Sequence, residues 1–318
     1  MRSIFAAAII AAALTTGAQA QRAFYSPAGG SGTACTQAAP CADYMSAYSV
    51  AGDNGTIFHL SPGHFGSGVI SSNAVNQQGF GQASGVAFLE YSHSAPRNVT
   101  VRDLSVSRTW YGPAGANYHA TGGSLTLENV SFSTPDSANM SGVLFAPSGA
   151  ATLSLKNVSF NGFSTGAGAA IRIVTGGQNV NVTLDNVNVS GGIRGIVIDT
   201  SGGGWAKVNI ENSSFTNITG PAIYGNAGSG NIRLYLDNVS ATNSNVGVVM
   251  AGANALAWMT QSKIAGNATG IQQAAGAKIY SYKDNQIFNN GTDGTPLPAS
   301  PSPVQSMPGN EIASAAGR

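Results

Sequence analysis

The feature that most constrains this chain is an eight-residue pattern that recurs from residue 99 onward. Its copies are VTVRDLSV, LTLENVSF, LSLKNVSF, VTLDNVNV, VNIENSSF and LYLDNVSA. The fifth residue of each copy is an acid or an amide, and successive copies are 26, 28, 29, 26 and 26 residues apart: Asp103, Asn129, Asn157, Asn186, Asn212 and Asn238. A period of this length, in repeats rich in β-branched residues, predicts a solenoid.

The hydrophobic alternation changes phase inside each copy. In LTLENVSF the apolar residues are Leu125, Leu127, Val130 and Phe132, whereas one straight strand would keep the same parity throughout. Each copy therefore predicts two short strands joined by a sharp corner. Asparagine tolerates the left-handed backbone that such a corner needs, and stacked asparagines can bond one another as a ladder.

A third short apolar segment recurs with the same period, beginning at residues 142, 170, 195, 222, 247 and 270. Three strands per turn, without helical periodicity, predict an all-β chain that forms a single three-sided parallel β-helix of about 8–10 coils with an N-terminal cap. We expect the cap at residues 21–56, the β-helix at 57–291 and a Pro/Ser-rich tail at 292–318, where the prolines are too dense for a strand ladder.

Residues 1–20 have the character of a secretory signal peptide. Arg2 precedes an apolar run from Ile4 to Leu14, and the sequence AQA at 18–20 is typical of a cleavage site. The run is too short for a membrane span, and no later run reaches span length. We therefore expect a secreted or periplasmic protein, in which Cys35 and Cys41 form a disulfide within the cap.

The charge of the chain excludes one class of partner. Only 8% of the residues are charged, and the formal net charge is +1 with no basic run. Nucleic-acid binding relies on clustered lysine and arginine, so we expect no nucleic-acid partner.

The N-terminal segment YSPAGGSGTACTQAAPCADYMSAYSVAGDNGTIFHLSPGHFGSGVI, together with the repeats, resembles the pectin-lyase-like right-handed parallel β-helix superfamily, and in particular a group of secreted bacterial β-helix proteins. The resemblance covers residues 24–291 and implies a right-handed solenoid. The superfamily holds lyases, hydrolases, epimerases, esterases and non-catalytic adhesins, so the resemblance indicates a fold more than an activity.

By the same resemblance, chemistry would lie on the outer side of the third strands, where residues about one turn apart become neighbours. Arg172 and Asp199 fall on adjacent turns there, with Arg194 near them; an ordinary surface ion pair is the alternative. A lyase or epimerase without a metal would use an arginine for the substrate carboxylate and His119 or Tyr118 as base. One carboxylate on this face disfavours glycoside hydrolysis, and no acidic cluster suggests calcium, so we expect neither metal nor cofactor.

The segment SRTWYGP at 107–113 is a candidate glycan-binding loop. The rings of Trp110 and Tyr111 have faces on which a sugar can stack, and Arg108 has the geometry to hold an acidic sugar. Alternatively, Trp110 packs as core at the edge of a turn. Tyr118 and Tyr224 are further candidate ligand contacts.

Two functions follow from the sequence. The favoured one is an exported, monomeric β-helix protein that binds polysaccharide or a cell-surface glycan without catalysis, because the face that would carry chemistry has few ionisable groups. The alternative is a metal-independent lyase or epimerase that acts on an acidic glycan.

Overall fold

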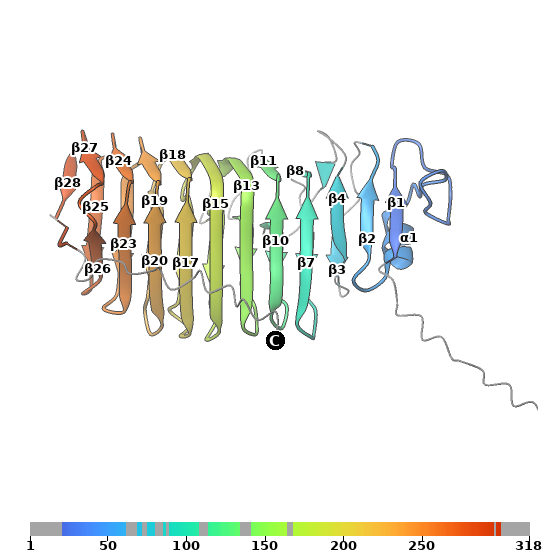
Figure 1. The fold of residues 1–318 in the computed structure, drawn as a ribbon, viewed down its shortest axis with the longest axis horizontal. Helices are drawn as coiled ribbons and strands as arrows, with labels where there is room; N and C mark the ends of the chain where they lie inside the picture. Colours follow the sequence, from blue (N-terminus) through green and yellow to red (C-terminus); the bar gives the residue numbers. More distant parts are fainter. Residues whose placement is uncertain are drawn as a thin grey trace, which may run out of the picture.

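The structure is a computed structural model, and it describes residues 21–61, 69–71, 75–79, 85–86, 89–107, 114–133, 141–163, 168–295 and 297–299. Parallel strands stand side by side along one long axis, from β1 near the N-terminal end to β28 at the other (Figure 1). Strands that are neighbours in space are separated by one turn of the chain, as in β10 and β13. The predicted three-sided parallel β-helix is therefore confirmed.

Two of the three faces merge into one sheet of eighteen strands, because β13 and β15 continue through the corner between them. We call the face that precedes this corner in each turn the long face, and the face that follows it the short face. The strands of the long face are β1 (Arg22–Tyr25), β2 (Thr56–His59), β4 (Asn76–Gly79), β7 (Arg97–Arg102), β10 (Gly123–Glu128), the first parts of β13 (Ala151–Phe163) and β15 (Asn179–Gly192), β17 (Trp205–Glu211), β20 (Asn231–Asp237), β23 (Ala255–Thr260) and β26 (Lys278–Ser281).

The short face follows the corner, and the third face forms a separate sheet of ten strands. The short face holds β5 (Gly85–Val86), β8 (Ser105–Ser107), β11 (Ser131–Ser133), the ends of β13 and β15, β18 (Ser214–Ile218), β21 (Ser240–Thr242), β24 (Lys263–Ala265) and β27 (Gln286–Phe288). The third face holds β3 (Val69–Ser71), β6 (Leu89–Tyr91), β9 (Ala114–Tyr118), β12 (Ser141–Phe145), β14 (Ile171–Val174), β16 (Ile196–Asp199), β19 (Pro221–Asn226), β22 (Val246–Ala251), β25 (Thr269–Ala274) and β28 (Thr292–Gly294).

The corner between the long and short faces is left-handed at every predicted position. Asp103 and the five asparagines have φ between 49° and 55°. Gln261 and Lys283, which the pattern did not mark, also have positive φ, 48° and 67°, and they follow the paired strands β23 and β26. The left-handed corner therefore continues in the two turns where a glutamine or a lysine replaces the asparagine.

The corner side chains form the predicted hydrogen-bonded ladder, except that one asparagine bonds to a different neighbour. Asn129 donates to Asp103, Asn157 to Asn129, and Asn238 to Asn212, each at 2.9 Å. Asn186 likewise donates to Asn157 at 2.9 Å. Asn212, however, donates to the carboxylate of Asp185 at 3.0 Å. A charged acceptor makes the stronger hydrogen bond, which accounts for the displacement.

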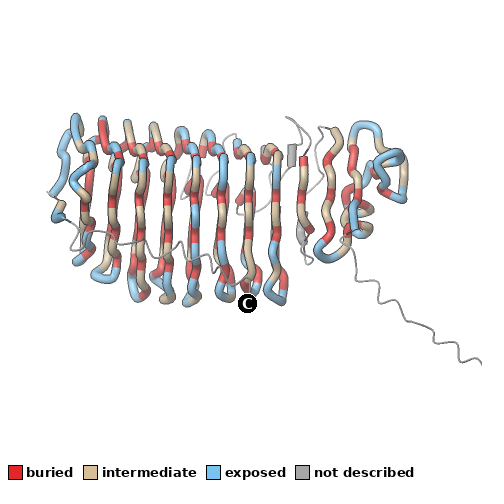
Figure 2. Tube along the Cα trace, viewed as in Figure 1, coloured by how far each residue is buried: buried red, intermediate tan, exposed pale blue. Residues whose placement is uncertain are grey.

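The core runs the length of the solenoid. Leu125, Leu127, Val130 and Phe132 are all at most 2% exposed, which confirms the predicted slip in parity. Figure 2 shows the resulting alternation of buried and less buried residues along each strand. Side chains of one turn lie directly on those of the next: the rings of Phe132 and Phe160 stack with centroids 4.9 Å apart. Stacked burial of this kind supplies most of the stability of a solenoid.

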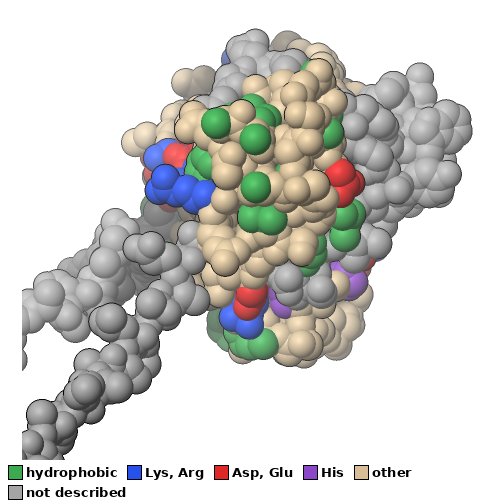
Figure 3. Space-filling view, turned by 90° about the vertical axis from the view of Figure 1, so that its right-hand side faces the viewer, with side chains coloured by type: hydrophobic (Ala, Val, Ile, Leu, Met, Phe, Trp, Pro, Cys, Tyr) green, Lys and Arg blue, Asp and Glu red, His purple; other side chains and the backbone are tan. Residues whose placement is uncertain are grey.

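The N-terminal end is covered by a disulfide loop and one helix. Cys35 and Cys41 form the predicted disulfide, and the loop that it closes bonds to β1 through Phe24 N to Cys35 O at 2.8 Å. The helix α1 (Tyr44–Ala51) begins after Asp43, whose carboxylate accepts the Ser46 N–H at 2.8 Å as an N-cap. Viewed from this end, the surface carries only scattered hydrophobic side chains (Figure 3). No helix in the described ranges has the length and apolarity of a membrane span.

The other end extends into the segment that we assigned to the tail. Thr292–Gly294 forms β28, which pairs with β25, and Ala299 makes an isolated parallel bridge with Ser281. Both pairings add strand-like backbone to open sheet edges, the places where unpaired N–H and C=O groups would otherwise remain.

Candidate functional site

The third face has the predicted register. Arg172 of β14 lies between Leu144 of β12 and Val197 of β16, and Val197 lies next to Tyr224 of β19. Val197 is only 7% exposed although it is on the outer side of the sheet. Tyr224 is half-buried between Val197 and Val249. This part of the face is therefore apolar, with the Arg172 guanidinium embedded in it.

The predicted charged constellation is not assembled as an ion-pair network. Asp199 pairs in register with Val174, two residues beyond Arg172, and its Oδ1 accepts the Ser201 N–H at 3.0 Å. Arg172 and Asp199 are both described, and no ion pair joins them. The Nε of Arg172 is buried and has no hydrogen-bond partner in the described structure. The backbone carbonyl of Arg194 accepts the Ala170 N–H at 3.0 Å.

The two candidate bases are engaged elsewhere. His119 follows β9, which is separated from β14 by β12, and its Nε2 forms a hydrogen bond with Glu90 Oε1 at 3.0 Å. The prediction for Tyr118 is wrong, since its side chain is fully buried and stacks on Phe145. Its hydroxyl donates to the Gly122 carbonyl at 2.6 Å, and burial raises its pKa to about 12. Tyr118 is a core residue and is available neither as a base nor as a ligand contact.

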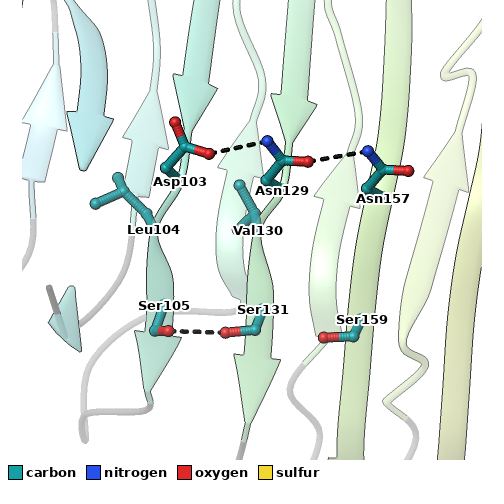
Figure 4. A pocket seen from close by; sticks show the side chains of 8 residues that line it. All are labelled: Asp103, Leu104, Ser105, Asn129, Val130, Ser131, Asn157 and Ser159. Atoms are coloured by element: carbon teal, nitrogen blue, oxygen red, sulfur yellow. Dashed lines mark hydrogen bonds between the residues drawn. The ribbon is translucent and has the colours of Figure 1, made fainter. Parts of the chain in front are cut away.

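A cavity of about 470 Å³ lies at the corner between the long and short faces. Two files of polar side chains line it, as Figure 4 shows: the corner residues in one file and three serines of the short face in the other. The files are Asp103, Asn129 and Asn157, and Ser105, Ser131 and Ser159. We call this site the corner cavity. The sequence pattern predicts a structural role for the corner residues and gives no sign that they face a cavity.

The lining of the corner cavity is held in place by its own hydrogen bonds. Asp103 accepts from Asn129 at 2.9 Å and from Gln78 at 2.7 Å. The hydroxyls of Ser105 and Ser131 lie 2.8 Å apart. Each ladder amide carries two N–H donors and uses one of them on its neighbour, which leaves further donor capacity at the cavity surface. Among the described residues that line it, Asp103 is the single ionisable group.

A second surface that the sequence analysis missed lies on the long face, on β17, β20 and β23. Three columns of outward side chains run along the solenoid axis, and we call them together the long-face array. The basic column is Lys207, Arg233 and Leu256, the middle column is Asn209, Tyr235 and Trp258, and the acidic column is Glu211, Asp237 and Thr260. Asp185 extends the acidic column on β15, and Tyr280 extends the middle column on β26.

The long-face array has distinct electrostatics. The rings of Tyr235 and Trp258 stack at 4.9 Å, so their edges point outward. The Arg233 guanidinium lies 5.4 Å from the ring centre of Trp205, which is 47% exposed. Partial burial and the adjacent carboxylates of Asp185 and Asp237 raise the pKa of Glu211. The repeats, whose last copy ends at Ala241, predict the register of β17 and β20 but do not extend to β23 and β26.

The remaining predicted ligand contacts, Arg108, Trp110 and Tyr111, lie outside the described residues. They belong to the connection between β8, which lines the corner cavity, and β9. Within the described part of the chain, no group of three or more histidine, cysteine, aspartate or glutamate side chains is arranged to hold a metal ion.

Comparisons with known proteins identify no family. No protein-family model matches the chain, and no curated protein matches it. Among solved structures, the chain is similar to the GH136 lacto-N-biosidase from Eubacterium ramulus, with a TM-score of 0.37 and 10% identity over 85% of this chain and 68% of that chain. A likeness at this level carries no information about activity.

Proposed function

We propose that this protein is exported and binds a polysaccharide or cell-surface glycan in the corner cavity without catalysis. The observation that carries the proposal is the cavity itself, a site of about 470 Å³ whose lining combines fixed hydroxyl, amide and carboxylate groups with the side chains of Leu104 and Val130. Small-molecule sites have volumes of roughly 300 to 1,000 Å³ and orient their ligands through a few convergent polar groups. A sugar offers the matching set of hydroxyl donors and acceptors.

The chemistry of the lining favours a neutral glycan. Asp103 is the one charged group among the described lining residues, and its carboxylate already accepts two hydrogen bonds. Acid–base hydrolysis of a glycosidic bond needs two carboxylates on either side of the bond. A single, already bonded carboxylate supports binding and gives no second group for catalysis.

The periodic lining also suits a polymer. A corner residue and a serine recur at β8, β11 and β13, neighbouring strands that are about 4.8 Å apart. A glycan chain that lies along the solenoid axis meets a carboxylate or amide and a serine hydroxyl on each turn. Trp110 follows β8 in sequence, and its ring is proposed to stack on a sugar of the bound glycan.

Export is part of the proposal. It is supported by the signal-like residues 1–20 and by the Cys35–Cys41 disulfide, since disulfides persist in oxidising compartments. N-terminal sequencing of the protein recovered from the culture medium or periplasm tests it. A mature chain that begins at Gln21 supports export, and an intact Met1 in the cytoplasm contradicts it.

Binding in the corner cavity is tested by filling it. Ser131→Trp places a large ring in the cavity, whereas Ser214→Trp adds the same ring to the same column of the short face on β18, outside the cavity lining. On an array of neutral and acidic glycans, we expect Ser131→Trp and Trp110→Ala to weaken binding at least about tenfold, or roughly 1.4 kcal/mol. Ser214→Trp should bind as the wild type does. Equal binding by all these variants would exclude this cavity.

A metal-independent lyase or epimerase is the second candidate, and one observation favours it. Arg172 presents a buried Nε without a partner, and a substrate carboxylate would supply the missing acceptor. Against it, His119 is hydrogen-bonded to Glu90 and Tyr118 is buried. Unsaturated or epimerised uronate formed by the wild type and lost in Arg172→Ala would establish this second function.

A further inference from the structure

We propose that the long-face array docks a second copy of this chain around a two-fold axis that runs along its middle column. This proposal concerns a different surface from the corner cavity and revises the monomer expected from the sequence. It rests on the order of charge on the adjacent strands β17 and β20. Together with β23, these strands stand nearly parallel with little twist in Figure 1.

The array has the symmetry that a two-fold interface requires. In an isologous dimer, residue i of one copy meets residue j of the other, and j meets i. On β20, Arg233 and Asp237 lie two residues on either side of Tyr235. Both are therefore about 6.6 Å from the middle column. A rotation of 180° about this column places Arg233 of one copy on Asp237 of the second copy, twice per dimer.

The acidic column lacks a cation of its own within the described structure. The described contacts between basic and acidic side chains join Arg97 to Asp53, Arg102 to Glu128, and His119 to Glu90. None of them involves Asp185, Glu211 or Asp237, which sit on adjacent strands. Like charges on adjacent strands are unfavourable. A cation from a second copy relieves this repulsion, and the raised pKa of Glu211 is consistent with the need for it.

The basic column is positioned to supply the cation. Arg233 donates to the backbone carbonyl of Ile232 at 3.1 Å and to that of Asn254 at 3.3 Å, both through one terminal nitrogen, while its plane lies near Trp205. These contacts fix the guanidinium and leave its other terminal nitrogen to donate. The outward edges of Tyr235 and Trp258 then meet their own counterparts at the axis, as aromatic residues commonly do at the centre of interfaces.

The area is sufficient for a modest dimer. Five strands from β15 to β26 at about 4.8 Å, with about seven residues each at 3.3 Å, outline roughly 550 Å² per copy. The total of about 1,100 Å² lies near the lower limit of specific interfaces. We therefore expect an association that is visible in the micromolar range and weakened by salt.

A charge exchange tests the pairing. Sedimentation of the wild type is expected to show dimers at about 100 µM. Arg233→Asp and Asp237→Arg each create two like-charge contacts per dimer and should weaken dimerisation at least about tenfold. The double variant that combines both exchanges should restore it, because each pair regains opposite charges. Arg102→Asp, on the same face but outside the array, should leave dimerisation unchanged.

The remaining outcomes contradict the proposal. The proposal is overturned if the wild type stays monomeric at this concentration, or if the single exchanges do not weaken its dimer. It is also overturned if the double variant stays monomeric although its circular dichroism and unfolding temperature match those of the wild type. Glycan binding in the corner cavity is measured separately with Ser131→Trp, so loss of one proposal leaves the other standing. The alternative occupant of the array is an added polyuronate. In that case the wild type is monomeric and binds the polyuronate, and Arg233→Asp does not bind it, which also contradicts dimerisation.

Discussion

The side-chain amide of Asn157 donates to the Oδ1 of Asn129 at 2.9 Å across 28 residues of sequence. Both residues are in the left-handed region, with φ of 54° and 55°. The same side chain thus serves two purposes: it permits the corner backbone, and it ties one turn of the solenoid to the next. In three consecutive turns the corner side chains also form a wall of the corner cavity.

Substitution of Asn157 separates these two contributions. Asn157→Gly keeps a backbone that favours positive φ but removes two ladder hydrogen bonds, so we expect a loss of about 1 to 2 kcal/mol. Asn157→Ala removes the same bonds and adds left-handed strain of about 1 kcal/mol. Urea unfolding of both variants measures the difference. Equal stability of the two would show that the corner backbone does not discriminate against alanine.

The fold was largely predictable because the inward side of a solenoid is tightly constrained. The parity slip at Glu128–Asn129 predicted the corner, and the repeat spacing predicted which residues become lateral neighbours, as Arg172 and Val197 are. One inward residue was nevertheless proposed as a base and ligand contact: Tyr118 is hydrophobic in its body, and its hydroxyl is satisfied by the Gly122 carbonyl. The hydroxyl of a tyrosine suggests chemistry even where the strand alternation places its ring in the core.

The candidate sites were less predictable because outward residues are not constrained by the core. The corner cavity is made of residues whose backbone role already explained them, so nothing in Asn129 or Ser131 marked a binding surface. The long-face array required comparison of four consecutive turns in register, since Arg233, Tyr235 and Asp237 are unremarkable as a single strand. The membership in the pectin-lyase-like superfamily stays a prediction.

Removal of the disulfide should destabilise the cap. Replacement of Cys35 and Cys41 by serine releases a loop with six residues of sequence separation, and loop closure of this size contributes about 2 kcal/mol. Amide hydrogen exchange should rise in β1 and in the loop and remain unchanged in β17. Uniform exchange across both regions would show that the cap and the solenoid unfold as one unit.

The stability of the cap should fall at acidic pH. Burial lowers the pKa of His59 to about 4, although its bond to Gln77 opposes this shift. Because the folded pKa lies below the unfolded value of 6.5, the unfolded chain takes up a proton first. The contribution of neutral His59 to the free energy of unfolding is complete above pH 6.5 and is lost as the pH falls toward 4. The total loss is about 3 kcal/mol.

Thermal unfolding between pH 7 and 4.5 measures this effect. His59→Gln removes the titration and keeps a hydrogen-bonding amide beside Gln77, so its unfolding temperature should depend less on pH than that of the wild type. His119→Gln, at an exposed histidine, is the matched control. Parallel pH profiles for the wild type and His59→Gln would exclude His59 as the source.

The stacked core should be sensitive at its largest side chains. Phe160 is 1% exposed and stacks on Phe132, so Phe160→Ala is expected to cost about 3 to 5 kcal/mol. Ser159→Ala, at the neighbouring outward position, should cost less than about 1 kcal/mol. Chemical unfolding of both variants measures the two losses, and a loss near 1 kcal/mol for Phe160→Ala would show that the adjoining turns collapse into the space.

Glycan binding without turnover is the property on which the proposed function depends. The decisive measurement is a calorimetric titration of the wild type with the glycan that it retains on an array, followed by chromatography and ultraviolet spectroscopy of the recovered glycan. We predict saturable binding, lost in Ser131→Trp, and recovery of the glycan with unchanged length and no unsaturated sugar. Shortened or unsaturated product that accumulates with wild-type protein would contradict this function.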